Sequence, residues 1–240
     1  YYTVDGISRG FTLSYQTTDF AELSTADYKI DNGLAAVRFG IPLSEFNKFS
    51  FGTGLNLIDF ATNPLVASQE VLAWEASEGN QYLNANANIA WTHDSRDSAI
   101  FPRQGMLQRL SAELTVPGSD LTYYKVDYSQ QHYFPLTEKL VLGLVGNVGY
   151  AEAYGDSQQL PIWENFFAGG PRSIRGYKSY SIGPRDSQGD PLGGNSKLLG
   201  TAELSFPAPL YPDSMRLLAF FDAGMVVDTS GTGYDVEELR

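Results

Sequence analysis

Apolar and polar residues alternate along most of this chain, and a period of two predicts β-strands that have one apolar and one polar face. The alternation is cleanest near 82–93, where the apolar face is interleaved with Asn84, Asn86 and Asn88. Eight other segments repeat the pattern. The nine predicted strands lie near 7–16, 33–42, 48–60, 82–93, 106–116, 122–134, 139–151, 197–206 and 215–228. The pattern therefore predicts an all-β, antiparallel fold.

Two all-β architectures fit this pattern, a soluble β-sandwich and a transmembrane β-barrel. The predicted strands of about 9–12 residues match the roughly 9–11 that cross a bilayer at a tilt, and they exceed the usual length of about 5–6. Three asparagines in a row on one face suit a water-filled lumen better than a dry core. Short and long connections also alternate, as in outer-membrane barrels, although the link at 117–121 is short where a long one is expected. These features favour the barrel.

Aromatic residues near the predicted strand ends support the barrel, because membrane barrels carry aromatic girdles at both interfaces. The candidates for these girdles are Tyr15, Phe60, Trp91, Tyr133, Phe134, Tyr150, Phe206 and Tyr211. Nine is an odd number of strands, whereas bacterial single-chain barrels have an even number. We therefore expect the chain to be a portion of a larger barrel.

Composition narrows the possible functions only slightly. The chain has 28 acidic and 16 basic residues, which argues against a nucleic-acid surface, since such surfaces need clustered Lys and Arg. The absence of cysteine excludes disulfides and thiolate metal sites. No apolar run approaches the roughly 18 residues of a membrane helix.

The long segment 152–196 interrupts the strand pattern. Structureless loops of this length are usually functional or disordered, but this one contains residues of the kind that are usually buried. They are Ile162, Trp163, Phe166, Phe167, Ile174 and Tyr177. We therefore expect the loop to fold back onto the barrel. A shorter interruption near 61–81 contains Val71–Trp74, which predicts a short helical turn.

Arg175 is the residue of this loop with the clearest chemical role. Glu203 and Asp222 lie on the polar faces of the two strands that follow, and a guanidinium suits paired carboxylates. If the loop enters the lumen, Arg175 can reach both acids. Glycines would permit the sharp turns of an inserted hairpin, at Gly169, Gly170 and Gly176. From the charge pattern alone, an exposed arginine in a surface loop is an equal alternative.

Several motifs together resemble a known family. The first is 161–170 (PIWENFFAGG), followed by Ile174, Arg175, Gly176 and Tyr177 and then by IGP at 182–184 and GGN at 193–195. PGSD at 117–120, YYKV at 123–126 and FFDAG at 220–224 fit the same pattern, and RD at 96–97 with Phe101, Pro102 and Gly105 resembles its periplasmic turn. The chain thus resembles the BamA family of outer-membrane protein assembly factors, in the superfamily with TamA and the two-partner-secretion transporters.

The resemblance implies a barrel of sixteen strands in the bacterial outer membrane, with these nine as its fifth to thirteenth. The periplasmic POTRA domains, the first four strands and the last three would lie outside this chain, and with them the seam between first and last strands. The 152–196 loop would fold into the lumen, with Ile174–Tyr177 as its motif and Arg175 against Glu203 and Asp222.

The function that the resemblance implies is assembly and insertion of barrel proteins into the outer membrane. The implied partners are nascent barrel proteins, outer-membrane lipid and lipopolysaccharide, and accessory lipoproteins that bind through the periplasmic domains. No nucleic acid is expected. The alternatives are a superfamily relative that exports or assembles one dedicated partner and, from a different class, a passive porin.

No pattern in the sequence predicts enzymatic chemistry. The two histidines, His93 and His132, are far apart in the chain and fit interfacial or turn positions. We expect no catalytic residues, no metal and no cofactor, and hence a non-enzymatic insertase.

Overall fold

The computed structural model describes residues 6–20, 27–211 and 215–230 of the chain. Within them, nine strands form one antiparallel sheet in which each strand pairs with the next in sequence. The strands are β1 (Ser8–Asp19), β2 (Tyr28–Pro42), β3 (Asn47–Thr62), β4 (Gln81–Asp94), β5 (Gly105–Thr115), β6 (Tyr123–Pro135), β7 (Val141–Ala153), β8 (Ser196–Pro207) and β9 (Arg216–Val227). One helix, α1 (Gln69–Glu78), and one 3₁₀ turn, η1 (Ile162–Glu164), complete the described elements. The all-β prediction with nine antiparallel strands is confirmed.

The first two strands are longer than the alternation predicts. β2 begins at Tyr28 instead of near 33, and β1 continues to Asp19, which pairs with Lys29. Polar side chains interact across this extension, where the Thr17 hydroxyl donates to Asp31 at 2.5 Å. Such cross-strand polar pairs stabilise a ladder without an apolar face, so hydrophobic patterning does not reveal them.

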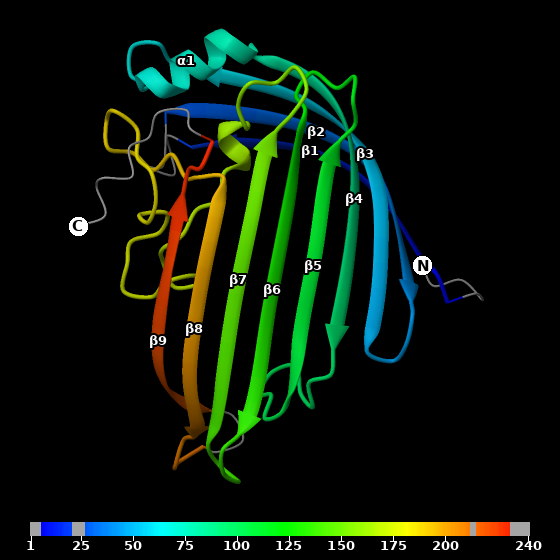
Figure 1. Cartoon of the computed structure of the whole chain (residues 1–240), viewed down its shortest axis with the longest axis vertical. Helices are drawn as coiled ribbons and strands as arrows, with labels where there is room; N and C mark the ends of the chain where they lie inside the picture. The colour runs from blue at the N-terminus through cyan, green and yellow to red at the C-terminus, as the bar shows by residue number, and fades with distance from the viewer. Residues whose placement is uncertain (1–5, 21–26, 212–214, 231–240) are drawn as a thin grey trace.

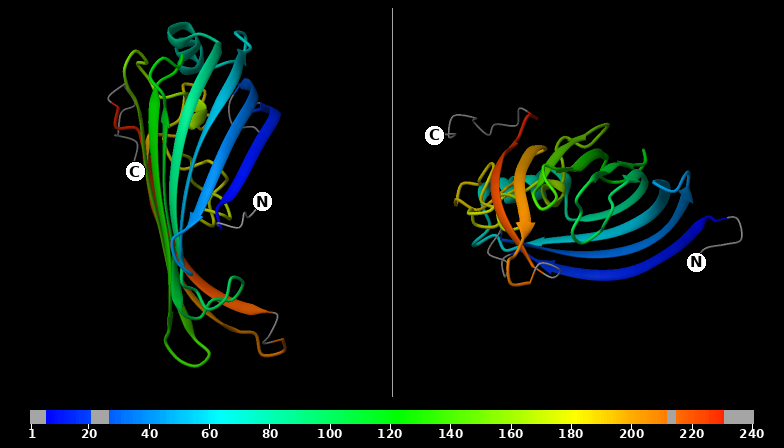
Figure 2. Two further views of the ribbon diagram at one scale, coloured as in Figure 1. Left: turned by 90° about the vertical axis from the view of Figure 1, so that its right-hand side faces the viewer. Right: turned by 90° about the horizontal axis from the view of Figure 1, so that it is seen from below.

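The sheet is strongly curved, as Figure 2 shows. The long connections and α1 gather at one end of the strands, which we call the upper end, and short turns join the strands at the lower end (Figure 1). The segment between β7 and β8, residues 154–195, lies against one face of the sheet. We call this segment the inner loop and the face that it contacts the inner face.

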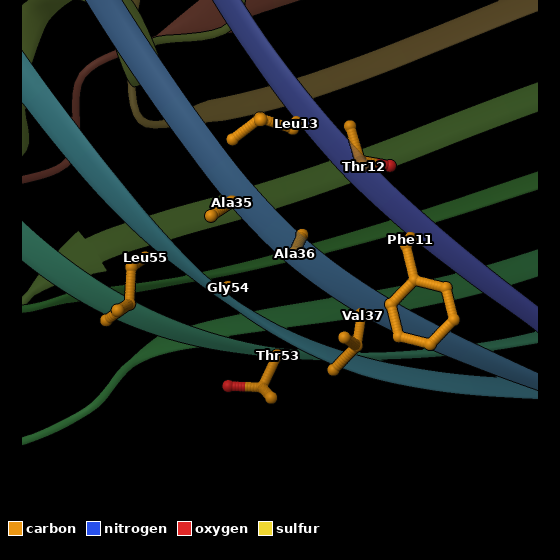
Figure 3. Close-up of a pocket in the computed structure, with 9 residues that line it drawn as sticks. All are labelled: Phe11, Thr12, Leu13, Ala35, Ala36, Val37, Thr53, Gly54 and Leu55. Carbon is orange, nitrogen blue, oxygen red and sulfur yellow. The ribbon is translucent and has the colours of Figure 1, made fainter.

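The opposite, outer face is apolar and exposed. Phe11 and Leu13 of β1 are 83% and 89% exposed, and apolar side chains on the other strands continue the band. Exposed apolar residues in every second position are typical of a lipid-facing barrel wall. On β1–β3 this face has a shallow groove of about 480 Å³, lined by nine residues that are mostly apolar (Figure 3). Its apolar lining fits hydrocarbon rather than a polar ligand.

A cluster of buried side chains closes the upper end, and we call it the upper cluster. It joins the upper ends of β2–β4 to α1 and to the inner loop. Its members are Tyr28, Ile30, Ile58, Phe60, Ala67, Val71, Trp74, Tyr82, Leu121, Ile162 and Leu192, with Phe20, Leu72 and Trp163 packed against them. The centroid of the Trp74 ring lies 5.1 Å from that of the Phe60 ring and 4.9 Å from that of the Trp163 ring. Ser68 directly precedes the helix that carries Trp74, and its hydroxyl accepts from the Val71 N–H as an N-cap.

Two assignments made from the sequence are wrong at this end. Phe60 is not in an outer girdle, because it points to the inner face and is buried beside Trp74. Asn84 faces inward as predicted but is only 1% exposed, and its side-chain oxygen accepts from the Leu121 N–H at 2.9 Å. The upper part of the wall is therefore covered by the loops instead of lying open to water.

Tyr133 also differs from its prediction as a girdle residue. It lies on the inner face at the lower end, where its ring is next to Gly143 and its hydroxyl donates to Gln131. The alternation at the end of β6 does predict the inner face for Tyr133. The girdle prediction was wrong because it considered only aromatic type and position near a strand end, and not which face the residue is on.

Candidate functional site

The inner loop doubles back on itself to form an irregular hairpin. Isolated backbone bridges pair Phe166 with Gly194 and Ala168 with Ile182. A sharp turn follows at Gly169, whose φ is +102° and where a Cβ would lie 2.5 Å from the Lys178 carbonyl oxygen. Only glycine fits this combination of dihedral angle and close approach. Gly170 and Gly176 also have positive φ, at +92° and +88°.

This hairpin brings Arg175 against the two acids on β8 and β9. The Arg175 Nε and Nη2 donate to the two carboxylate oxygens of Asp222, both at 2.8 Å. Its Nη1 donates to Glu203 at 3.1 Å, and its guanidinium stacks 3.4 Å from the centroid of the Phe220 ring. The structure therefore brings together all three charged residues singled out from the sequence, and the alternative of an exposed surface arginine is wrong.

Asp222 is the most enclosed of the three, with a side chain that is 3% exposed against 24% for Arg175. Its oxygens also accept from the Arg175 backbone N–H at 2.9 Å and from the Thr201 hydroxyl at 2.8 Å. Hydrogen bonding to Asp222, and then to Glu203, raises the pKa of Arg175 above its ordinary value. The guanidinium therefore stays charged and fastens the loop to two adjacent strands.

The neighbours of Arg175 in the motif have different environments. Ile174 is buried, and its side chain lies over Gly224 of β9. Tyr177 was predicted to be of the buried kind, but it is 61% exposed. The motif thus places one apolar and one charged side chain against the wall and leaves its aromatic ring free of it.

A second set of contacts, which the sequence did not reveal, joins the inner loop to α1 and to the segment just before it. The Ser187 N–H and hydroxyl donate to Glu70 at 3.1 and 2.8 Å, and the Gln188 amide donates to the Val66 carbonyl at 2.7 Å. At the root of the loop, the Gln158 N–H donates to Glu78 at 3.0 Å. We call these contacts the helix latch. They join residues far apart in the chain, and no spacing rule predicts them.

The histidines lie apart, in contacts that carry no catalytic arrangement. His93 Nδ1 lies 3.1 Å from the Asn47 side-chain oxygen, and the His132 ring stacks on Phe134. In residues 6–20, 27–211 and 215–230, three or more His, Cys, Asp or Glu side chains do not gather as a metal site would require. The ion pairs of Arg175 with Glu203 and Asp222 fasten the loop to the barrel wall.

A curved antiparallel sheet with an apolar outer face and a loop bound to its inner face defines part of a membrane β-barrel that carries an inserted loop. The model of the Omp85 superfamily domain matches residues 1–238. The chain belongs to this superfamily.

Proteins similar to this chain come from bacteria and animals. The chain is 34% identical over 250 residues to "Outer membrane protein assembly factor BamA" of Neisseria meningitidis, covering 98% of this chain and 31% of that protein. It is 35% identical over 140 residues to the human "Sorting and assembly machinery component 50 homolog", covering 56% and 29%. It thus spans about a third of the length of these relatives.

A solved structure is similar over nearly the whole chain. It is the crystal structure of BamA from Haemophilus ducreyi lacking POTRA domains 1–3, which superposes with a TM-score of 0.85 at 27% identity. The match covers 95% of this chain and 48% of that one. The prediction of a BamA-like barrel portion is confirmed.

Proposed function

We propose that this chain forms part of a protein that assembles β-barrel proteins and inserts them into the bacterial outer membrane without enzymatic chemistry. The observation that carries the proposal is the match along 98% of the chain to a relative named as an outer-membrane protein assembly factor. The second relative is also named for sorting and assembly. The exposed apolar outer face of the sheet also fits a barrel in the outer membrane.

Within this function we assign the inner loop a bracing role. Arg175 pairs with both Glu203 and Asp222 and ties the loop to β8 and β9. Such a tie keeps a long segment in one position while the barrel around it deforms, because breaking it leaves a buried carboxylate unpaired. Ile174 and Gly176 support the Arg175 position, and Gly169 and Gly170 set the turn before it.

The partners follow from the two faces of the wall and from the rest of the protein. The apolar outer face would contact lipid and lipopolysaccharide acyl chains. Nascent barrel proteins would be the substrates, and accessory lipoproteins would bind to periplasmic domains outside this chain. The upper end with its loops would face outward and the short turns would face the periplasm.

Depletion of the parent gene in its native host, followed by quantitation of all outer-membrane barrels, tests the proposal. A general fall in many barrels is expected. Loss of one secreted protein with other barrels intact would replace the proposal with a dedicated exporter. An unchanged barrel profile, combined with large steady openings of the purified protein in planar bilayers, would replace it with a porin.

A further inference from the structure

Phe166 lies at the start of the hairpin in the inner loop, away from the Arg175 ion pairs. The Lys125 Nζ on β6 is 4.8 Å from the centroid of its ring, and the Lys197 Nζ on β8 is 4.6 Å from it. Two ammonium groups therefore contact one aromatic ring, an arrangement in which the negative face of the ring attracts the cations.

Gly149 of β7 forms the floor beneath this ring. A Cβ at this position would lie 2.7 Å from Phe166 Cζ and 2.7 Å from Lys197 Cε. Gly149 pairs with Asp127 on one side and with Lys197 on the other. The missing side chain thus leaves a recess in the wall, between β6 and β8, that the Phe166 ring fills.

Both lysines are themselves fixed in place by acids. Lys197 Nζ contacts Asp127 at 2.6 Å. Lys125 Nζ donates to the Glu164 side chain at 3.1 Å and to its carbonyl oxygen at 2.8 Å. Because Glu164 belongs to η1 of the same loop, Lys125 contacts the loop at two neighbouring residues. Phe166 itself is buried, and its backbone exchanges two hydrogen bonds with Gly194 at 2.8 and 3.0 Å.

We propose that Phe166, Gly149, Lys125 and Lys197 form a second anchor, the Phe166 socket, which positions the root of the inner loop independently of Arg175. The two anchors share only β8, since the socket spans β6–β8 and Arg175 binds β8 and β9. Two separated attachment points fix both the depth and the direction of a loop, whereas one point leaves it free to pivot. The consequence of the socket for assembly in cells rests on the function proposed above, but its existence does not.

The test uses the purified full-length protein with all other cysteines removed and Ala168→Cys as a reporter. Ala168 is buried two residues beyond Phe166, so a hydrophilic maleimide labels this cysteine only when the root leaves the wall. Gly149→Ala places a methyl group against the ring, and we expect several-fold faster labelling. Gly146→Ala on the same strand is the matched control, because a Cβ there meets nothing within 4 Å.

Further variants separate the socket from general damage to the barrel. Phe166→Leu keeps apolar volume but removes the ring face, and Lys125→Met with Lys197→Met keeps the stems but removes the charges. Both should raise labelling. With Phe166→Leu the electrophoretic mobility shift on heating should remain at its wild-type temperature, whereas the double lysine variant also leaves Glu164 and Asp127 unpaired and should lower that temperature. Arg175→Ala alone should leave Ala168→Cys protected. Equal labelling of the Gly149→Ala and Gly146→Ala proteins, or full release of Ala168→Cys by Arg175→Ala, would overturn the proposal; neither readout depends on assembly activity.

Discussion

Arg175 joins two carboxylates on adjacent strands. Its contribution to stability is measured by removing it, which leaves both carboxylates unpaired. Arg175→Ala leaves the nearly buried Asp222 carboxylate without its cation, and we expect a loss of up to about 3 kcal/mol of barrel stability. The loss is smaller than for a fully buried pair because Arg175 and Glu203 keep part of their hydration. A lower temperature for the heat-induced shift in electrophoretic mobility would report it.

Arg175→Lys is the informative companion variant. A lysine ammonium carries the charge but cannot form the planar fork to Asp222 and also reach Glu203, so its stability should lie between wild type and Arg175→Ala. Arg172→Ala is the control, since Arg172 is exposed in the same loop. Wild-type stability of both Arg175 variants would contradict the fastening role.

For single side chains, the sequence predicts ion-pair partners more readily than aromatic contacts. The parity of Glu203 and Asp222 on their strands places both carboxylates on the inner face, and so Arg175 could be matched to them in advance. Phe166 was expected only to be buried. Its contact with Lys125 and Lys197 depends on the register of three strands, which alternation within each strand does not determine.

Among the elements, α1 depends on the upper cluster for its position. Trp74 packs against Phe60 and Trp163 at once, so Trp74→Ala should open a cavity that costs about 3–5 kcal/mol of local stability. Limited proteolysis of the protein in membranes should then cut within 63–80. Leu65→Ala, at an exposed position in the same connection, should leave the protease pattern unchanged, and equal resistance of both variants would contradict the packing described here.

The helix latch predicts a dependence on acidity. Burial of Glu70 acts against its ionisation, but the hydrogen bonds from Ser187 hold its pKa below the ordinary value, which is about 4.3. A carboxyl group whose pKa is lowered by folding stabilises above its unfolded pKa and loses that contribution as pH falls through the folded pKa. The latch should therefore be intact at neutral pH and weaken as the pH falls through the lowered pKa of Glu70.

Hydrogen exchange of the α1 amides at a series of pH values, corrected for intrinsic exchange, measures this weakening. Glu70→Gln keeps the shape without the charge, so its protection should be lower at neutral pH and should not fall further in acid. A wild-type protein whose α1 protection stays constant from neutral pH to below the Glu70 pKa would contradict the latch.

The elements themselves were mostly predictable, and the exceptions share one cause. Strict alternation predicted β4 at 82–93 against the observed Gln81–Asp94, which is within the usual uncertainty of element ends. The start of β2 at Tyr28 and the full extent of α1 were not predicted, because polar cross-strand pairs and tertiary packing define them. The helix around Trp74 is stabilised by packing against residues of other elements. A pattern within the local sequence does not include these contacts.

At the scale of the whole molecule, the sheet has two edges. Within the described residues, β1 pairs only with β2 and β9 only with β8. Open edges are not compatible with the hydrocarbon region, where every backbone group needs a partner. The similarity to BamA barrels explains the two open edges, because this chain covers 48% of the H. ducreyi structure. The expected further strands would pair with β1 and β9 and close the sheet. The odd strand count indicated this from the sequence.

Under the proposed function, the protein that contains this chain speeds the insertion of barrel proteins, and the inner loop braces its barrel. The most direct measurement of this acceleration is the folding rate of an unfolded outer-membrane barrel protein added to liposomes that contain the purified full-length protein. We predict faster folding than in empty liposomes, a smaller acceleration with Arg175→Ala, and wild-type acceleration with Arg172→Ala. Equal folding rates in empty and protein-containing liposomes, with the protein itself folded and correctly oriented, would contradict the proposed function.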